Sequence, residues 1–238
     1  MRDSRKASVS LKEVFEAVWP ICVGYFAIGA AFGVLAQKAG LKPLEIGLMS
    51  VFVFAGSAQF IAVSMLSSGA AAASVILTTF VVNIRHLLMS SSLAVHLNGC
   101  RRRFLFLYAY GITDESFAVN TTRFREGRWN AYNALAVNHI ANVVWVGSTV
   151  AGGFAGQFIP AGSYGIDYAL SAMFISLLVL QTRGGIYVIT AILAGGCSVL
   201  LSLFVPGNMH VIVASLFGAT AAFGIRAFLD GQRGGSRW

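Results

Sequence analysis

The chain has 238 residues, of which 57% are hydrophobic and only 11% are charged, and its formal net charge is +8. Apolar runs of about twenty residues follow one another almost without interruption, a pattern of membrane-spanning helices and not of a soluble domain. The lysines and arginines lie mainly in the tails and in the short loops between these runs, so the basic charge does not indicate nucleic-acid binding. The sequence therefore predicts an all-α polytopic protein of the lipid bilayer.

Polar tails flank the apolar part of the chain. We expect a basic tail at 1–13, one transmembrane domain over 14–229, and a polar C-terminal tail at 230–238. The first apolar run is too long and too rich in glycine for a cleaved signal peptide, so it is expected to stay in the protein. The three cysteines are far apart, which supports neither a disulfide framework nor a metal site.

The first two spans contain small and polar residues at their centres. In the first span, 14–36, Gly29-Ala30-Ala31-Phe32-Gly33 presents a small-residue face that favours close packing on a neighbouring helix. We expect this face, or the similar one at Gly152–Gly156, to suit a helix of a second subunit. The second span, 44–67, is expected to be interrupted at Phe54-Ala55-Gly56-Ser57-Ala58-Gln59-Phe60, where freed backbone groups could bind a ligand. An ordinary tight helix crossing is the alternative.

The third run, 70–97, carries Arg85 near its middle, within Asn83-Ile84-Arg85-His86. An arginine at the bilayer centre costs about 3 kcal/mol, so its charge must be compensated, and we favour a substrate or ion site over a purely structural ion pair. As one continuous helix this run would be about 42 Å long, well beyond the apolar thickness of a bilayer. We therefore expect the helix to tilt strongly or to break, with 83–86 as the break.

The next two runs place further polar groups at membrane depth. The fourth, 104–122, is interrupted at its centre by Thr113-Asp114-Glu115-Ser116, which brings two carboxylates into an apolar segment. The fifth span, 130–153, carries Asn138 and Asn142 on one helical face, where they either line a polar path or cross-link helices by hydrogen bonds. The sixth, 166–181, opens with Asp167, and the last two, 186–205 and 208–229, resemble scaffold.

Charge in the loops does not decide the topology. Eight spans with the N-terminus inside, and seven spans with 104–122 re-entrant and the N-terminus outside, both satisfy the positive-inside rule. Residues 57–61 and 171–175 match at four of five positions at an offset of 114, which Gly33 and Gly147 share. This match predicts two half-repeats, about 14–122 and 130–229, with a substrate between them. The seven-span version would make these halves inverted.

Five motifs, in order, resemble those of the AzlC family of branched-chain amino acid permease subunits. They are Gly29–Gly33, Phe54–Phe60, Asn83–His86, Gly111-Ile112-Thr113-Asp114-Glu115-Ser116-Phe117, and Asp167-Tyr168-Ala169-Leu170. The resemblance covers nearly the whole chain. It implies a multi-pass protein of the bacterial inner membrane that exports branched-chain amino acids together with a small AzlD-like membrane subunit. Ser171 stands where the family pattern has proline, so the residue that would break the sixth span is absent.

A zwitterionic amino acid needs a cation for its carboxylate, an anion or carbonyls for its ammonium group, and an apolar pocket for its side chain. Arg85 can hold a carboxylate bidentately, and Asp114 or Glu115 can take the ammonium group or a coupling proton. We expect the substrate-binding residues to be Arg85, Asn83, Gly56, Ser57, Gln59, Phe60, Asp114, Asn138 and Asn142. We expect the proton-coupling residues to be Glu115, His86, His139 and Asp167, with packing histidines as the alternative for His86 and His139.

Two other classes of protein could carry polar residues at membrane depth. A passive channel or pore for small zwitterionic or polar solutes would use the same polar residues as a selectivity ring, and uphill flux tied to the proton gradient separates it from a transporter. An intramembrane enzyme would need a catalytic or metal constellation. The sequence has no HExxH motif, no nucleophile elbow and no metal-ligand spacing, so we expect no enzyme activity, no metal and no cofactor.

Overall fold

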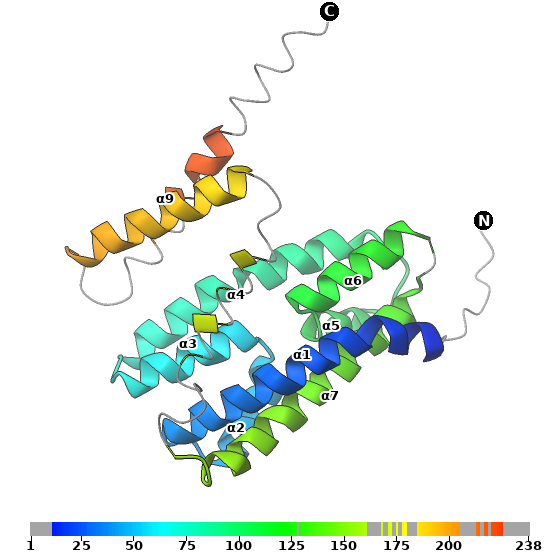
Figure 1. The fold of residues 1–238 in the computed structure, drawn as a ribbon. Coiled ribbons are helices and arrows are strands. Elements are labelled where there is room, and N and C mark those ends of the chain that lie inside the picture. The colour runs from blue at the N-terminus through cyan, green and yellow to red at the C-terminus, as the bar shows by residue number, and fades with distance from the viewer. Residues whose placement is uncertain are drawn as a thin grey trace, which may run out of the picture. The chain divides into compact units, whose positions relative to one another are not determined.

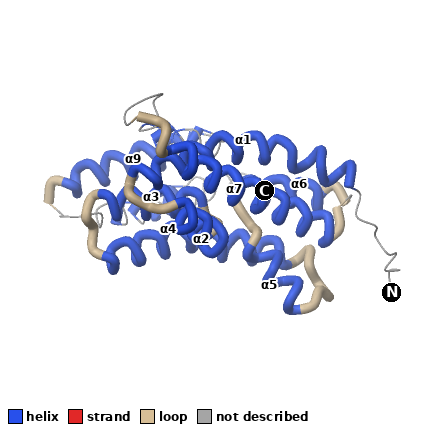
Figure 2. The backbone as a smooth tube through the Cα atoms, turned by 90° about the horizontal axis from the view of Figure 1, so that it is seen from below, coloured by secondary structure: helices blue, strands red, loops and turns tan. Residues whose placement is uncertain are grey.

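The computed structural model describes residues 11–127, 129–160, 168, 171–172, 175, 178–179, 185–204, 213–214, 217–218 and 220–225. In this part of the chain every regular element is a helix and none is a strand, which confirms the all-α prediction there (Figure 2). The chain divides into two compact units, 1–170 and 171–238. This division differs from the half-repeat boundary expected near 122–130, and the repeat stays a prediction.

The first unit contains most of the described helices (Figure 1). They are α1 (Leu11–Lys38), α2 (Pro43–Val53), α3 (Gly56–Ser67), α4 (Ala72–Ala94), α5 (Arg102–Tyr110), α6 (Asp114–Arg125) and α7 (Ala131–Gly156). Three of them, α1, α4 and α7, are long and apolar enough to cross a membrane. In the second unit, α9 (Gly185–Ser202) corresponds to the seventh predicted run. The sixth and eighth predicted runs lie largely outside the described residues.

Helices α1 and α7 lie side by side and run in the same direction (Figure 1). A Cβ atom at Gly33 would overlap the backbone of Thr149, and one at Gly152 would overlap the backbone of Ala30. Because the two backbones touch, only residues without a side chain fit at these positions. The predicted close packing of Gly29–Gly33 is thus confirmed. The expectation that a second subunit covers this face or Gly152–Gly156 is wrong, because each face covers the other.

The second predicted span is interrupted where the sequence indicated. Phe54 has a left-handed backbone, with φ of 32°, and separates α2 from α3. Helix α2 runs antiparallel to α7, since Pro43 lies beside Gly153 and the Ser50 hydroxyl is 2.8 Å from that of Thr149. The predicted interruption is confirmed.

Helix α3 then turns back toward the end from which α2 came. It begins next to Arg85 in the middle of α4 and is joined to the start of α4 by the short turn 68–71. At its other end α4 leads to His96, whose ring stacks on Phe124 at 4.8 Å, near the N-terminal end of α1. The α2–α3 pair is therefore a hairpin that enters and leaves at the C-terminal end of α1, and 44–67 does not form a single crossing.

Helices α5 and α6 form a second hairpin, which enters from the opposite end. Helix α5 runs parallel to α7, because the Phe104 ring lies 5.2 Å from that of Tyr132 and the Tyr108 carbonyl accepts a hydrogen bond from Asn138. The chain turns at 111–113, and α6 returns to the N-terminal end of α1. This geometry is the one expected if 104–122 is re-entrant.

The predicted break at 83–86 is wrong, because α4 is continuous from Ala72 to Ala94. Residues 70–71 and 95–97 lie outside the helix, which shortens it to 23 residues, or about 35 Å. A helix of this length spans the apolar layer without breaking. Helix α4 also has no glycine or proline, and the side chains of Arg85 and His86 are bonded to other elements instead of to their own backbone.

The backbone contact between α1 and α7 predicts opposite effects for two glycines of α7. We expect Gly152→Ala to destabilise the protein by about 2 to 3 kcal/mol, because its methyl group meets the α1 backbone. An added Cβ at Gly147 has no atom of the described residues within 4 Å, so Gly147→Ala should be neutral or stabilising by up to about 1 kcal/mol. Thermal unfolding in detergent measures both. Equal stability of the two variants would contradict the close α1–α7 contact.

Candidate functional site

The tips of the two hairpins meet at Arg85. Its Nη1 atom lies 2.6 Å from Oδ2 of Asp114, the first residue of α6. Its Nη2 atom donates a hydrogen bond of 2.5 Å to the hydroxyl of Ser57, in the first turn of α3. One guanidinium group on α4 therefore joins both tips. The Tyr110 hydroxyl joins them a second time, by donating a hydrogen bond to the Val51 carbonyl.

The start of α6 stabilises the two carboxylates that the sequence placed at membrane depth. Asp114 and Glu115 occupy the first turn of α6, where the positive end of the helix dipole favours negative charge. Thr113 caps this helix: its hydroxyl accepts a hydrogen bond from the Ser116 amide, and the Ser116 hydroxyl accepts one from the Thr113 amide. Asp114 is thus the counter-charge that Arg85 requires.

Glu115 points to a different partner, Tyr25 of α1. The buried Tyr25 hydroxyl is 2.7 Å from the Glu115 carboxylate and 2.7 Å from the Thr113 hydroxyl. A tyrosine hydroxyl has one proton, so when Glu115 is ionised Tyr25 donates its hydrogen bond to Glu115 and accepts one from the Thr113 hydroxyl. Sequence reasoning did not single out Tyr25. The available signal was a hydroxyl in the apolar middle of the first span, where it needs a partner.

One turn of α4 carries buried polar atoms that have no hydrogen-bond partner among the described residues. The His86 ring nitrogen Nδ1 lies 3.0 Å from the Ile112 carbonyl, which the break between α5 and α6 leaves free. Within the part of the chain that the structure describes, Asn83 Oδ1, Arg85 Nε and His86 Nε2 are buried and have no hydrogen-bond partner. Such atoms are uncommon in native proteins. Arg85 Nε belongs to the ion-paired guanidinium itself, while Asn83 lies two residues before Arg85 and so on another side of α4. Among the described residues, such atoms also occur in Gln37, Tyr108, Thr121 and Asn133. Those of α4 are available to a polar ligand.

Other predicted binding residues of the first hairpin take part in packing. The Gln59 amide accepts a hydrogen bond of 2.9 Å from the Trp145 indole and donates one of 3.0 Å to Ser50. The Phe60 ring is fully buried, 5.0 Å from that of Phe32. Gly56 faces the indole of Trp145, which an added Cβ would approach to 3.0 Å. These contacts fix the first hairpin to α1 and α7.

The asparagines of α7 hold the second hairpin. Asn138 donates to the Tyr108 carbonyl at 3.2 Å and accepts from the Asn120 amide at 2.9 Å. Asn142 donates to the Tyr110 hydroxyl at 3.3 Å. Asn138 therefore cross-links helices, as one of the two alternatives proposed.

The two remaining predicted coupling residues are His139 and Asp167. Nδ1 of His139 is 3.1 Å from the Leu135 carbonyl of its own helix. Asp167 lies outside the described residues.

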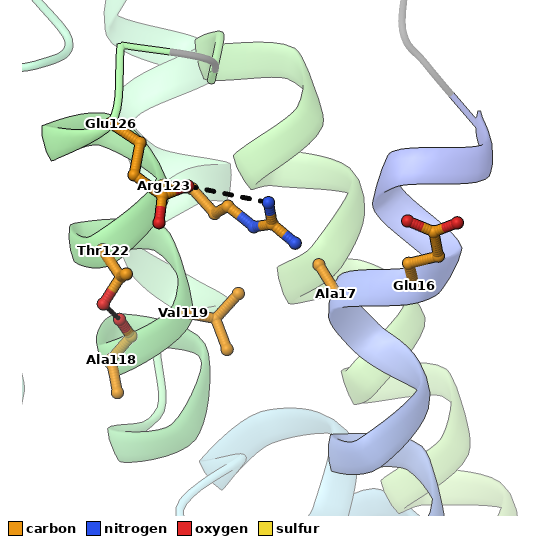
Figure 3. Close-up of a pocket in the computed structure, with 7 residues that line it drawn as sticks. All are labelled: Glu16, Ala17, Ala118, Val119, Thr122, Arg123 and Glu126. Atoms are coloured by element: carbon orange, nitrogen blue, oxygen red, sulfur yellow. Dashed lines mark hydrogen bonds and ion pairs between the residues drawn. The ribbon is translucent and has the colours of Figure 1, made fainter.

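A pocket of about 500 Å³ lies between α1 and α6, toward the N-terminal end of α1. It is lined by Glu16, Ala17, Ala118, Val119, Thr122, Arg123 and Glu126. Figure 3 shows the Arg123 side chain reaching from α6 toward Ala17, with its ion pair to Glu126 at 3.7 Å. Sequence reasoning did not identify this pocket, because its walls come from segments about a hundred residues apart.

Three long apolar helices with two interrupted hairpins, and a charge pair held where the hairpin tips meet, define a multi-pass membrane protein of the transporter type. Residues 20–159 match the AzlC protein family, and the chain belongs to this family. It is 27% identical to the branched-chain amino acid transport protein AzlC of Bacillus subtilis, over 87% of this chain and 82% of that protein.

Two further relatives are also membrane proteins. The chain is 29% identical to the inner membrane protein YgaZ of Escherichia coli, over 89% of each chain. It is 30% identical to an uncharacterized membrane protein of Archaeoglobus fulgidus, over 84% of this chain and 88% of that one. No solved structure matches. These relatives confirm the resemblance that the motifs indicated and the location of the chain in the cell membrane.

The dual contact of Arg85 with Asp114 and Ser57 predicts that lysine cannot replace it. A lysine ammonium group is a single point charge, whereas the planar guanidinium bonds both tips at once. Arg85→Lys should lower transport of valine at least about tenfold while the protein still inserts, and the exposed Arg125→Lys should not. Initial rates in vesicles with equal amounts of protein measure this. Equal transport by wild type and Arg85→Lys would exclude the proposed role of Arg85.

Proposed function

We propose that this chain is the large subunit of an exporter for branched-chain amino acids, namely valine, leucine, isoleucine and their analogues. It works in the bacterial inner membrane, is coupled to the proton gradient, and acts with a small AzlD-like membrane subunit. Membership of the AzlC family and the name of the Bacillus subtilis relative support the substrate class. The partner and the direction of transport are supported by the family resemblance alone.

The observation that carries the proposal is the Arg85–Asp114 ion pair at the meeting point of the two hairpin tips. Without substrate, each charge neutralises the other, so neither is left uncompensated at membrane depth. A zwitterionic amino acid can insert between them, with its carboxylate on Arg85 and its ammonium group on Asp114. The internal pair is then replaced by two pairs to the substrate, and total charge in the site stays balanced.

The groups around the ion pair suit the rest of an amino acid. Arg85 Nε, which has no hydrogen-bond partner in the described structure, adds a second donor for the carboxylate. Asn83 stays a proposed binding residue on the same turn of α4, with its buried Oδ1 as the acceptor. The first-turn amides of α3 can also donate hydrogen bonds to the substrate carboxylate. They are free to do so because the N-cap residue, Ala55, has no side chain that could cap this helix. The rings of Phe54 and Tyr110, with centroids 6.1 Å apart at the hairpin tips, provide an apolar wall.

The hairpins also support a membrane topology for the first unit that differs from both versions expected from the sequence. In this topology α1, α4 and α7 cross the membrane, and the two hairpins are re-entrant from opposite sides. At the N-terminal end of α1 the described helix ends and loops carry Lys12, Arg101, Arg102, Arg103, Arg123 and Arg125, whereas the other end carries Lys38 and Lys42. The positive-inside rule then places the N-terminal end of α1 in the cytoplasm.

The two carboxylates of α6 have separate roles in this mechanism. Asp114 stays ionised against Arg85 or the substrate ammonium group. Glu115 contacts the neutral hydroxyl of Tyr25 and has no ion pair in the described part of the chain, so it is the better candidate for binding and releasing a proton. Of the two assignments open from the sequence, the contacts support this one.

Reconstitution in proteoliposomes tests the function. The chain, with and without a coexpressed small subunit, should move labelled valine, leucine and isoleucine against their gradients when a pH difference is imposed. Labelled methionine ranks the side-chain preference. Flux that only follows the substrate gradient, and does not respond to the pH difference, would contradict the exporter and support a passive channel.

Substitution of the two carboxylates separates binding from coupling. We expect Glu115→Gln to keep valine exchange and to lose uphill transport, because glutamine cannot carry a proton. Asp114→Asn should abolish both activities, since it leaves Arg85 without its counter-charge. Exchange and pH-driven transport of valine are measured on the same preparations. If Glu115→Gln still drives valine uphill with normal pH dependence, coupling must be sought at His86, His139 or Asp167.

A further inference from the structure

The pocket between α1 and α6 lies on the same face of α6 as Glu115. Ala118, Val119 and Thr122 line the pocket and follow Glu115 at three, four and seven residues, the spacing that keeps side chains on one side of a helix. On α1, Ala17 lines the pocket, and Tyr25 lies two turns further on, where it contacts Glu115. At 1.5 Å per residue, the pocket begins about 5 Å from Glu115 along the axis of α6.

This pocket is open, and we call it the groove between α1 and α6. Its two ends differ in polarity. Its outer end carries Glu16, Glu126 and Arg123 (Figure 3). The Arg123 guanidinium also lies 5.7 Å from the ring centre of Trp129. The inner part of the groove, nearest Glu115, is lined by the uncharged side chains of Ala118 and Val119. A charged mouth at the cytoplasmic end and a carboxylate beyond the inner end are the parts that a water-filled path for protons requires.

We propose that the groove between α1 and α6 is the path by which Glu115 exchanges its proton with the cytoplasm, and that Tyr25 positions the carboxylate at its inner end. This inference rests on the coupling role proposed above for Glu115. On release, the O–H bond of the Glu115 carboxyl group breaks and the proton passes to a water molecule in the groove. The carboxylate keeps the electron pair and accepts the hydrogen bond of the Tyr25 hydroxyl.

The charged groups around Glu115 agree with this role. Helix α1 presents Tyr25, helix α4 presents Arg85 and His86, and Asp114 is its neighbour on α6. Asp114 already neutralises Arg85 at 2.6 Å, and His86 is bonded through Nδ1 to the Ile112 carbonyl. Glu115 is therefore the carboxylate of the hairpin tip that can change its charge without breaking the central ion pair.

Filling the groove tests the proposal. We expect Ala118→Phe to slow pH-driven valine transport at least about tenfold, because the ring occupies the groove, and to leave valine exchange at equal pH within about twofold. The matched control is Ala155→Phe, at an exposed position of α7 outside the pocket, which should change neither rate. Both rates are measured with the full chain, and its small subunit, in proteoliposomes.

The outcomes separate this inference from the proposed function. Loss of exchange and of driven transport together in Ala118→Phe, or loss of neither, would overturn the proton path. Absence of valine exchange in the wild type would overturn the proposed function itself. Normal wild-type exchange with unchanged driven transport in Ala118→Phe would overturn this inference alone.

Tyr25→Phe provides a second measurement, because it removes the hydroxyl and keeps the ring that packs edge-on against Trp145 at 5.3 Å. The hydroxyl stabilises the ionised carboxylate, so its loss should move the pH profile of driven transport toward higher pH by at least about half a unit. A residue with only a packing role would lower the rate without moving the profile. An unshifted profile would exclude Tyr25 from the path.

Discussion

The charge of Arg85 in the middle of an apolar helix is the constraint on which the centre of this protein depends. It needs an opposite charge at the same depth, and Asp114 can supply one only because the chain turns between α5 and α6 at that level. The turn starts a new helix, whose positive dipole end stabilises Asp114 and Glu115 as anions. The arginine, the hairpin and the helix start therefore support one another.

Each interrupted hairpin leaves backbone groups without helical partners, and in a bilayer such groups must be satisfied by the protein. The Val51 carbonyl accepts a hydrogen bond from the Tyr110 hydroxyl, and the Ile112 carbonyl is within hydrogen-bond distance of the His86 ring. These contacts come from the other hairpin and from α4, so neither tip can move without changing partners.

The polar residues divide into those with complete hydrogen bonding and those without it. Gln59 and Asn138 are fully buried and bonded through both polar atoms, and they anchor the hairpins to the α1–α7 pair. Asn83, Arg85 and His86 each keep a buried polar atom without a partner in the described structure. The first group holds the hairpins in place, whereas the second group has hydrogen-bonding capacity that the described contacts do not use.

The sequence by itself determined the apolar helices, the close-packing glycines of α1, the interruption at Phe54 and the importance of Arg85, because hydropathy, small-residue spacing and the cost of a buried charge are local properties. It did not determine that α4 stays continuous, since helix length depends on where the flanking turns form. Nor did it distinguish Gln59, which packs, from Ser57, which meets Arg85, because both lie in one polar motif. Those assignments, and the pairing of Tyr25 with Glu115 across 90 residues, were decided only by the tertiary structure, which brings distant segments to the same depth.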